Sequence, residues 1–205
     1  MTNAVLEAIE QRRTTNIYDS ARTIGDDQIS ELVRLATRAP TAFHLQNWRF
    51  IAVRTPEARA RLRQLAFDQP KVTEAAVTFI VVGQLASHDM MAGRLASSVE
   101  AGFMPPEVVT GWEGAGQALY FEQPQRQRDE AVRTATFGAS YLLLAAQALG
   151  LGSSPMIGFD ADGVASEFGL ASDEVPVVLV TVGYAGEGNW PQKPRRPVAD
   201  LLTLA

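Results

Sequence analysis

Cysteine is absent from this chain of 205 residues, and histidine occurs only twice, at His44 and His88. The missing thiols exclude disulfides, thiolate metal sites and cysteine nucleophiles. They also agree with a reducing compartment, so we expect a cytoplasmic protein. Two histidines are too few for a multi-histidine metal site, and the sequence therefore predicts no metal centre.

A positive charge excess and a long apolar run are missing as well. The formal net charge is −5 and the sequence pI is about 5.1, so no overall attraction to nucleic acid or to an anionic membrane is expected. The most apolar window, 137–151, contains Gln147 and is too short to span a bilayer. Acidic residues interrupt the N-terminal segment, which indicates a mature helix and not a signal peptide.

Hydrophobic residues make up 46% of the chain, which is enough for a sizeable core in one domain covering residues 1–205. β-Branched and aromatic runs predict strands, and apolar residues at helical spacing predict helices. We expect strands at 48–53, 76–83 and 175–184. We expect helices at about 3–12, 26–39, 56–67, 90–100, 106–119, 129–149 and 161–169.

Capping residues indicate where three of these helices begin. Thr2 or Asn3 can cap the first helix, and Asp26 with Asp27 can cap the second. Thr55 precedes a proline, which is favoured at a first helical position.

Three other stretches carry structural expectations. The sequence FGASYLLLAAQAL in the long helix is apolar nearly all round, which predicts burial on most sides. The segment 153–160, SSPMIGFD, predicts a loop. Residues 87–125 are expected to form a helical excursion over a pocket or a dimer partner.

Two short basic segments, one near each end of the chain, are candidate anion sites. Residues 11–18 read QRRTTNIY, and residues 192–198 read QKPRRPV. Each has an ordinary alternative, because arginines suit the end of a helix and a basic tail is commonly a surface patch. The chain has neither GxGxxG nor GxxxxGK[ST], which disfavours Rossmann and P-loop nucleotide sites.

Several single residues could belong to a site but also have structural explanations. His44 could act as a general base, although no Ser, Cys or Asp pattern accompanies it. Lys71 follows a proline and could equally be a surface lysine. Trp112, Tyr120 and Phe121 could form a substrate pocket, or they could serve packing or a dimer face.

The order of five motifs is more specific than any one of them. QRRTTNIY is followed by APTAFHLQNWRF, FDQPK, AAQALGLGSSPMIGFD and KPRRP. This order resembles the FMN-dependent nitroreductase family over nearly the whole chain. The resemblance implies an α+β nitroreductase-like fold, with a central mixed or antiparallel sheet flanked by helices around a long buried helix. It also implies an intertwined homodimer with FMN at the interface.

The resemblance assigns cofactor contacts to positions along the whole chain. It implies that Arg12 and Thr14 hold the FMN phosphate together with Lys193 and Arg195, since guanidiniums suit a phosphate dianion. Arg13 is counted with them, with a surface position as its alternative. The other implied contacts are a loop from the partner chain (Pro40, Thr41, Ala42, His44 and Gln46), the pyrimidine edge (Asp68 and Lys71), and the N5 region (Pro155, Met156, Ile157 and Gly158).

Five positions depart from the family pattern, one of them being Asn47, where a Pro is common. Asn16 stands where a Lys or Arg near flavin N1 is usual, and Asp68 stands where a neutral amide is common. His44 replaces a common Asn, and Ile157 replaces a Glu found in some relatives. Losing a cation near N1 weakens the stabilisation of negative charge on the reduced flavin. We therefore expect a lower flavin midpoint potential than in relatives with two cations.

The resemblance implies that NADH or NADPH reduces FMN, which then reduces a flat electrophile such as a nitroaromatic, quinone or enone, with ping-pong kinetics. The protein would need no catalytic side chain of its own, because the flavin supplies the chemistry. Two alternatives stay open. One is other flavin chemistry on the same fold, such as dehalogenation or flavin fragmentation, and the other is a non-enzymatic flavin-binding or regulatory protein.

Overall fold

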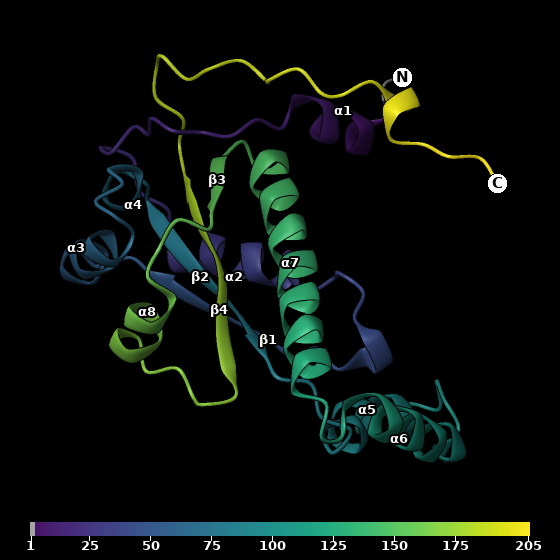
Figure 1. Ribbon diagram of the computed structural model, residues 1–205. Coiled ribbons are helices and arrows are strands. Elements are labelled where there is room, and N and C mark those ends of the chain that lie inside the picture. The colour runs from purple at the N-terminus through teal and green to yellow at the C-terminus, as the bar shows by residue number, and fades with distance from the viewer. Residues whose placement is uncertain (1–2) are drawn as a thin grey trace.

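The computed structural model describes residues 3–205 and contains a four-stranded antiparallel sheet with helices on both faces (Figure 1). The strand order is β1-β2-β4-β3. The strands are β1 (Trp48–Val53), β2 (Val77–Gln84), β3 (Gly152–Met156) and β4 (Glu174–Gly183). β2 and β4 are the two central strands, and their nearly continuous apolar sequences suit burial on both faces.

Helices account for most of the remaining chain. The helices are α1 (Ala4–Gln11), α2 (Asp26–Ala36), α3 (Pro56–Leu65), α4 (Lys71–Glu74), α5 (Met90–Glu100), α6 (Pro106–Tyr120), α7 (Pro124–Ala148) and α8 (Ala161–Glu167). Two short 3-10 helices are η1 (Ala42–His44) and η2 (Val198–Asp200). None of the helices in residues 3–205 is long and apolar enough to cross a membrane.

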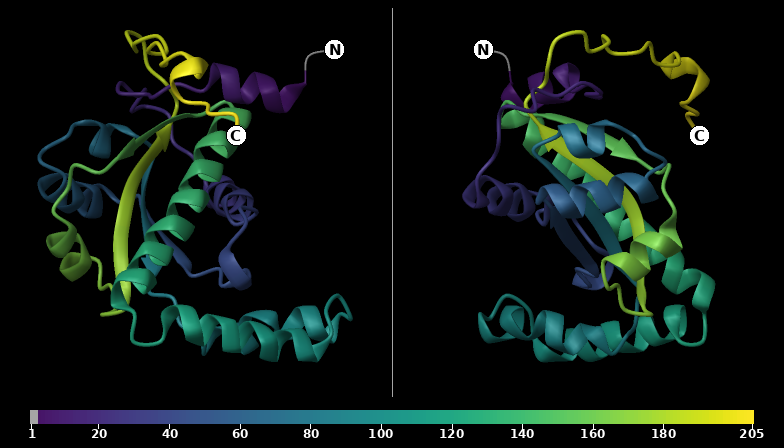
Figure 2. Two further views of the ribbon diagram at one scale, coloured as in Figure 1. Left: turned by 45° about the vertical axis from the view of Figure 1, so that its right-hand side comes forward. Right: turned by 90° about the vertical axis from the view of Figure 1, so that its left-hand side faces the viewer.

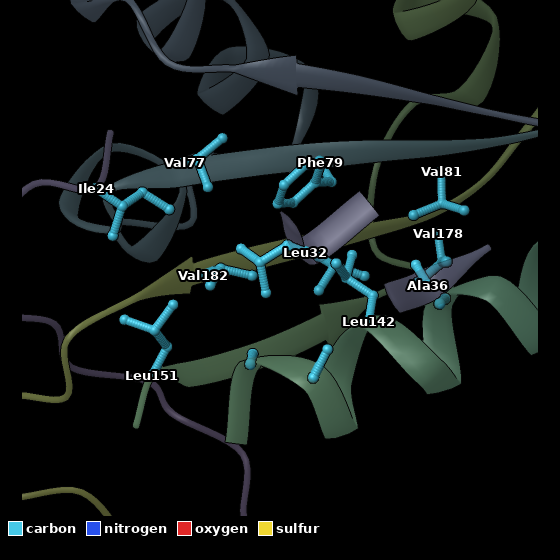
Figure 3. Packing of buried hydrophobic residues seen from close by; sticks show 14 of the residues in the cluster. Ile24, Leu32, Ala36, Val77, Phe79, Val81, Leu142, Leu151, Val178 and Val182 are labelled. Carbon is cyan, nitrogen blue, oxygen red and sulfur yellow. The ribbon is translucent and has the colours of Figure 1, made fainter. Parts of the chain in front are cut away.

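The alternation of side chains along β2 divides the core into two layers. Val77, Phe79 and Val81 face α2 and α7, where they pack against residues such as Leu32 and Leu142 (Figure 3). The intervening side chains of β2 face α3, α4 and α8 and form a second buried cluster. The sheet is therefore covered on both faces and serves as a rigid support for the loops at its ends.

Close contact between α7 and the sheet depends on two glycines. A Cβ on Gly83 of β2 would lie 2.2 Å from the backbone oxygen of Ala131 in α7. A Cβ on Gly138 of α7 would lie 3.0 Å from the ring of Phe50 and 3.2 Å from that of Trp48. Glycine at these positions lets the helix and the sheet approach each other closely.

The excursion consists of α5 and α6, which project from the end of the sheet opposite the C-terminal tail (Figure 2). A third cluster, which includes Leu45, Met91, Leu95 and Tyr120, joins these helices to η1. The tail after β4 is exposed and extends away from the core (Figure 2).

The expected strands 48–53, 76–83 and 175–184 are confirmed with shifts of one residue, but the prediction of a loop at 153–160 is wrong in its first half. Residues Gly152–Met156 form the edge strand β3, paired with β4. The sequence has few β-branched residues there, and Pro155 is tolerated because an edge strand leaves one side without ladder bonds. The long helix begins at Pro124, five residues before the expected 129.

Two cap predictions are confirmed and one is wrong. The side chains of Asn3 and Thr55 accept hydrogen bonds from the first turns of α1 and α3, and Thr2, the other candidate, lies outside the described residues. The cap of α2 is Gly25, and Asp26 is already inside the helix. Gln28 accepts from the Gly25 amide at 3.3 Å, which provides part of the stabilisation expected from an aspartate cap.

The expectation that α7 is buried on most sides holds only in part. Ala135, Ala139 and Leu142 are buried against the sheet, whereas Phe137 and Tyr141 are exposed. One apolar side of α7 is thus open in a single chain.

Candidate functional site

The segment after α1 leaves the helix in extended form and runs alongside β3. Thr14 forms a parallel bridge with Ser153, and the Thr15 amide donates to the Ser153 carbonyl at 2.9 Å. Tyr18 forms an antiparallel bridge with Ala185 at the end of β4. The N-terminal segment is therefore fixed between β3 and the chain that follows β4.

The two basic ends of the chain meet in this region. A cavity of about 170 Å³ is lined by residues from both of them. The N-terminal segment contributes Thr14 and Asn16, and the tail contributes Trp190, Pro191, Gln192, Lys193 and Arg195. The Lys193 Nζ lies 5.4 Å from the centroid of the Trp190 ring, which holds this cation over an aromatic face. Residues from opposite ends of the sequence thus form one hollow with two cationic side chains.

Arg12 is close to Arg195, a residue of the cavity wall, and part of its guanidinium lacks a partner. Its Nη1 is buried and makes no hydrogen bond. Burial lowers the pKa of Arg12, and the nearby charge of Arg195 lowers it further. A buried donor next to a second cation is costly unless an anion accepts from both. The arrangement fits a dianionic group such as phosphate.

Arg13 points to a different place. It lines a larger cavity of about 450 Å³, together with Glu10, Gln11 and Gln147, on the other side of the N-terminal segment. Glu10 supplies a carboxylate to that cavity, so it is less suited to an anion than the hollow beside Arg12. The structure therefore separates Arg13 from Arg12 and Thr14.

Lys71 begins the short helix α4 close to β3. Its Nζ donates to Ser154 Oγ at 3.0 Å, and partial burial lowers the pKa of Lys71. Ser154 follows Ser153, to which Thr14 and Thr15 are paired. Lys71 is thus brought to the same edge of the sheet as the basic hollow.

The chain before α4 packs against the end of β3. Gln69 Nε2 donates to the Gly158 carbonyl at 2.9 Å. Pro155 and Gly158 are exposed, as is Ile157 with 84% of its surface, whereas the Met156 side chain is buried in the core. Only the backbone of Met156 can therefore contribute to a site on this surface.

Asp68 and its neighbour Phe67 are exposed residues in an unusual backbone conformation. Their φ angles are 56° and 53°, in the left-handed region that bulky residues rarely adopt. Asp68 Oδ1 lies 3.9 Å from Arg63 Nε, so its charge has a partner of opposite sign. Phe67 is 68% exposed and lies next to Gly158.

The loop from Pro40 to Gln46 lies far from the basic hollow within one chain. It packs against α5 and α6, at the opposite end of the molecule from the tail (Figure 1). His44 and Gln46 have φ angles of 55° and 44°, and their side chains form a hydrogen bond of 2.8 Å. Thr41 Oγ1 accepts from the Gln46 amide at 3.2 Å, and Ala42 begins η1.

The three candidate pocket residues lie around the excursion. Phe43 contacts the rings of Trp112 and Tyr120 edge-on, with centroids 5.8 and 6.4 Å apart. Phe121 is exposed and lies edge-on to His88. Burial raises the pKa of Tyr120 to about 12, and the adjacent Glu130, which accepts from its hydroxyl at 3.3 Å, adds to the shift.

Comparison with known sequences decides the family. Residues 9–184 match the model described as the nitroreductase family. The chain belongs to the nitroreductase family. YdgI of Bacillus subtilis, provisionally named an NAD(P)H nitroreductase, is 31% identical over 192 residues, which cover 92% of each sequence.

Two solved structures resemble this nitroreductase-family chain closely. One is a provisionally assigned nitroreductase from Exiguobacterium sibiricum in complex with FMN, with 29% identity, a TM-score of 0.90, and coverage of 100% of this chain and 98% of the other. The second is CLA-ER, an enone reductase of gut-bacterial fatty acid saturation, with 25% identity, a TM-score of 0.85, and coverage of 99% and 98%. The expected α+β nitroreductase-like fold is confirmed, and its sheet is antiparallel.

Sequence reasoning missed several residues of this nitroreductase-family site. Ser154 and Gln69 hold Lys71 and Gly158, Phe67 lies beside Gly158, and Asn189 bonds the backbone of the N-terminal segment. The FDQPK motif could have indicated Phe67 and Gln69, whereas Asn189 shows no local signal. Within residues 3–205, no group of three or more His, Cys, Asp or Glu side chains is arranged to hold a metal ion.

Proposed function

We propose that this member of the nitroreductase family is an FMN-dependent oxidoreductase that takes hydride from NADH or NADPH and reduces a flat electrophile. The observation that carries the proposal is the basic hollow beside Arg12. The hollow joins the two ends of the chain, and Arg12, which is close to Arg195 of its wall, has a buried Nη1 that lacks an acceptor. FMN carries a phosphate at one end, so it supplies the anion that these residues lack.

Four residues would hold the phosphate of FMN. Arg12 offers its unpartnered donor, and Thr14 offers a hydroxyl at the wall of the hollow. Lys193 and Arg195 approach from the tail and add charge. Charge-assisted hydrogen bonds of this kind are roughly twice as strong as neutral ones.

Lys71 and the surface around Gly158 would bind the flavin ring. When bound, FMN supplies the chemistry, because it accepts hydride from a reduced nicotinamide and passes it to an oxidant. Lys71 is held by Ser154 and presents a positive charge beside β3, where it would stabilise negative charge on the ring. Gly158 has no side chain, so a flat ligand can approach its backbone closely. One face serving both substrates in turn favours ping-pong kinetics.

A second copy of the chain would complete the site. The loop from Pro40 to Gln46, which resembles the family's partner-chain segment, lies too far away to reach the hollow of its own chain. An apolar groove of about 380 Å³ between α1, α2 and α7 is lined by Val5, Ile9, Leu35 and Tyr141 and lies open. Phe137 of α7 is exposed as well. Large exposed apolar surfaces of this kind typically mark interfaces.

The oxidant is proposed as a nitroaromatic, a quinone or an enone. The names of the relatives support this class, since YdgI is named for nitro compounds and CLA-ER for an enone. Trp112, Tyr120 and Phe121 would shape the pocket for it from the excursion of the partner chain. Trp112 and Tyr120 contact Phe43 in the loop that is proposed to cross the interface, and Phe121 lies edge-on to His88.

The visible absorption spectrum of the purified protein tests cofactor and reaction together. We expect a flavin spectrum that is bleached under anaerobic conditions by NADH or NADPH and restored by a quinone or a nitroaromatic. A protein that neither retains nor binds added FMN would refute the proposal. If the protein binds flavin but neither NADH nor NADPH bleaches it, the protein binds flavin without having the proposed activity.

A further inference from the structure

The side chain of Asn189 joins the two chain segments that form the basic hollow. Its Oδ1 accepts from the backbone amides of Asn16 at 2.7 Å and Ile17 at 3.0 Å. Its Nδ2 donates to the carbonyls of Ile17 at 2.7 Å and Gly186 at 3.0 Å. All four partners are backbone groups. The amide therefore takes the place of a backbone peptide between the N-terminal segment and the tail.

Asn189 stands where the backbone pairing of these two segments ends. The last backbone bond between them runs from the Gly186 amide to the Ile17 carbonyl at 3.0 Å. Gly188 then turns the chain with a φ of 86°, a conformation that suits glycine. Asn189 follows this turn, and the next residues are the wall of the hollow. Its side chain thus fixes the point from which Lys193 and Arg195 are presented.

The tail beyond Asn189 is held only weakly against the N-terminal segment. Gln192 Nε2 donates to the Arg12 carbonyl at 3.3 Å, which is long for such a bond. Lys193 and Arg195 are exposed. Without Asn189, binding of an anion would also have to order this part of the tail, and that ordering lowers affinity.

A carboxamide is the group that this position requires. It accepts two hydrogen bonds through its oxygen and donates two through its nitrogen, and all four are used. An aspartate would keep the acceptor. Its second oxygen, however, would face the carbonyl oxygens of Ile17 and Gly186 without a proton to share, and this costs more than a missing bond.

We propose that Asn189 is a positioning residue that sets the affinity of the site for the phosphate of FMN by fixing Lys193 and Arg195 relative to Arg12 and Thr14. This inference rests on the proposed function. It gives Asn189 no contact with the flavin ring. Its loss should therefore weaken the recognition of the phosphate and leave the recognition of the ring unchanged.

The test compares FMN with riboflavin, which has the same ring and no phosphate. Dissociation constants of both are measured by flavin fluorescence with the full-length apoprotein, for the wild type, Asn189→Ala, Asn189→Asp and Glu187→Ala. Glu187 is an exposed residue of the same turn and serves as the matched control. We expect Asn189→Ala to raise the dissociation constant of FMN by about tenfold, which is the effect of losing one hydrogen bond between a tail cation and the phosphate. The dissociation constant of riboflavin should stay within about twofold of the wild-type value.

Asn189→Asp should lower the affinity for FMN at least as much as Asn189→Ala. Glu187→Ala should change the affinity for neither flavin. Circular dichroism and thermal unfolding of each apoprotein show whether the variant is folded, and Asn189→Asp keeps the test usable if Asn189→Ala is not. The inference would be overturned if the variants lost affinity for FMN and riboflavin equally, or if both Asn189 variants bound FMN as tightly as the wild type. A wild type that binds neither flavin would refute the proposed function instead.

Discussion

Arg12 and Arg13 are neighbours in sequence, but Arg12 lies close to Arg195 of the hollow whereas Arg13 lines the other cavity, and this gives a sharp test at the scale of single residues. Arg12→Ala removes the unpartnered buried donor beside the hollow, so we expect FMN affinity to fall by roughly 10- to 100-fold. Arg13→Ala changes a side chain in the other cavity, and we expect a change of no more than about threefold. Titration of each apoprotein with FMN measures both. Equal losses in the two variants would contradict the assignment.

Asn16 lines the hollow, and the family resemblance predicts a cation at this position, so we expect the neutral Asn16 to give a lower flavin midpoint potential than a cation would. Asn16→Lys adds a positive charge near the flavin and keeps the backbone amide that Asn189 accepts from. We expect the potential to rise by tens of millivolts, since about 30 mV corresponds to 1.4 kcal/mol for two electrons. Anaerobic reduction against a reference dye measures the potential.

Asn16→Gln is the neutral control for this measurement and should leave the potential nearly unchanged. Lys71→Ala should lower the potential, because it removes the cation held by Ser154. An Asn16→Lys potential equal to that of the wild type would show that residue 16 does not lie near the flavin charge.

At the scale of elements, the contact of α7 with the sheet should be intolerant of added volume. Gly83→Ala would place a methyl group against the Ala131 backbone, which cannot move aside, so we expect a loss of about 3 kcal/mol or more in unfolding free energy. Gly138→Ala meets only the rings of Phe50 and Trp48 and should cost about 1–2 kcal/mol. Urea unfolding of each variant gives these values.

Gly111→Ala provides the control for those two substitutions. A Cβ at Gly111 in α6 has no neighbour within 4 Å, so the higher helix propensity of alanine should stabilise by up to about 1 kcal/mol. If Gly83→Ala and Gly138→Ala lowered the unfolding free energy by similar amounts, α7 would have to shift freely on the sheet.

The elements also show what the sequence could and could not predict. The continuous β-rich run at 76–83 and the Thr55 cap are local signals, and they predicted β2 and the start of α3 correctly. β3 was missed because its pairing with β4 makes it a strand, and its own residues carry little β preference. Asn189 was missed for a related reason. Its partners in the N-terminal segment, Asn16 and Ile17, lie more than 170 positions away in the sequence, so no spacing could indicate them.

At the scale of the whole molecule, Tyr18 should make stability depend on alkaline pH. Its hydroxyl is buried and lies 2.9 Å from Thr181 Oγ1, and burial raises the pKa of Tyr18 well above its usual value near 10. Below a pH of about 10, Tyr18 keeps its proton in both the folded and the unfolded protein. Above it, the unfolded chain loses a proton that the folded protein keeps, so stability falls by up to about 1.4 kcal/mol per pH unit.

Urea unfolding at pH 8 and at pH 11 measures this effect in the wild type and in Tyr18→Phe. We expect the variant to be less stable at pH 8, where it lacks the hydroxyl bonds, and the difference to narrow at pH 11. Other tyrosines, such as Tyr120, are common to both proteins and cancel in the comparison. Parallel pH profiles would show that Tyr18 ionises equally easily in both states.

The joining of the two chain ends at the hollow has a consequence for biosynthesis. A ribosome makes Arg12 and Thr14 before the sheet and α7, and Lys193 and Arg195 after them, and domains generally fold as they are made. Under the proposed function, a nascent chain could assemble the sheet and α7 yet hold only half of the phosphate site. Cofactor loading would then wait until the segment that follows β4 has been made. A protein that ends before residue 193 would fold around its core and stay colourless.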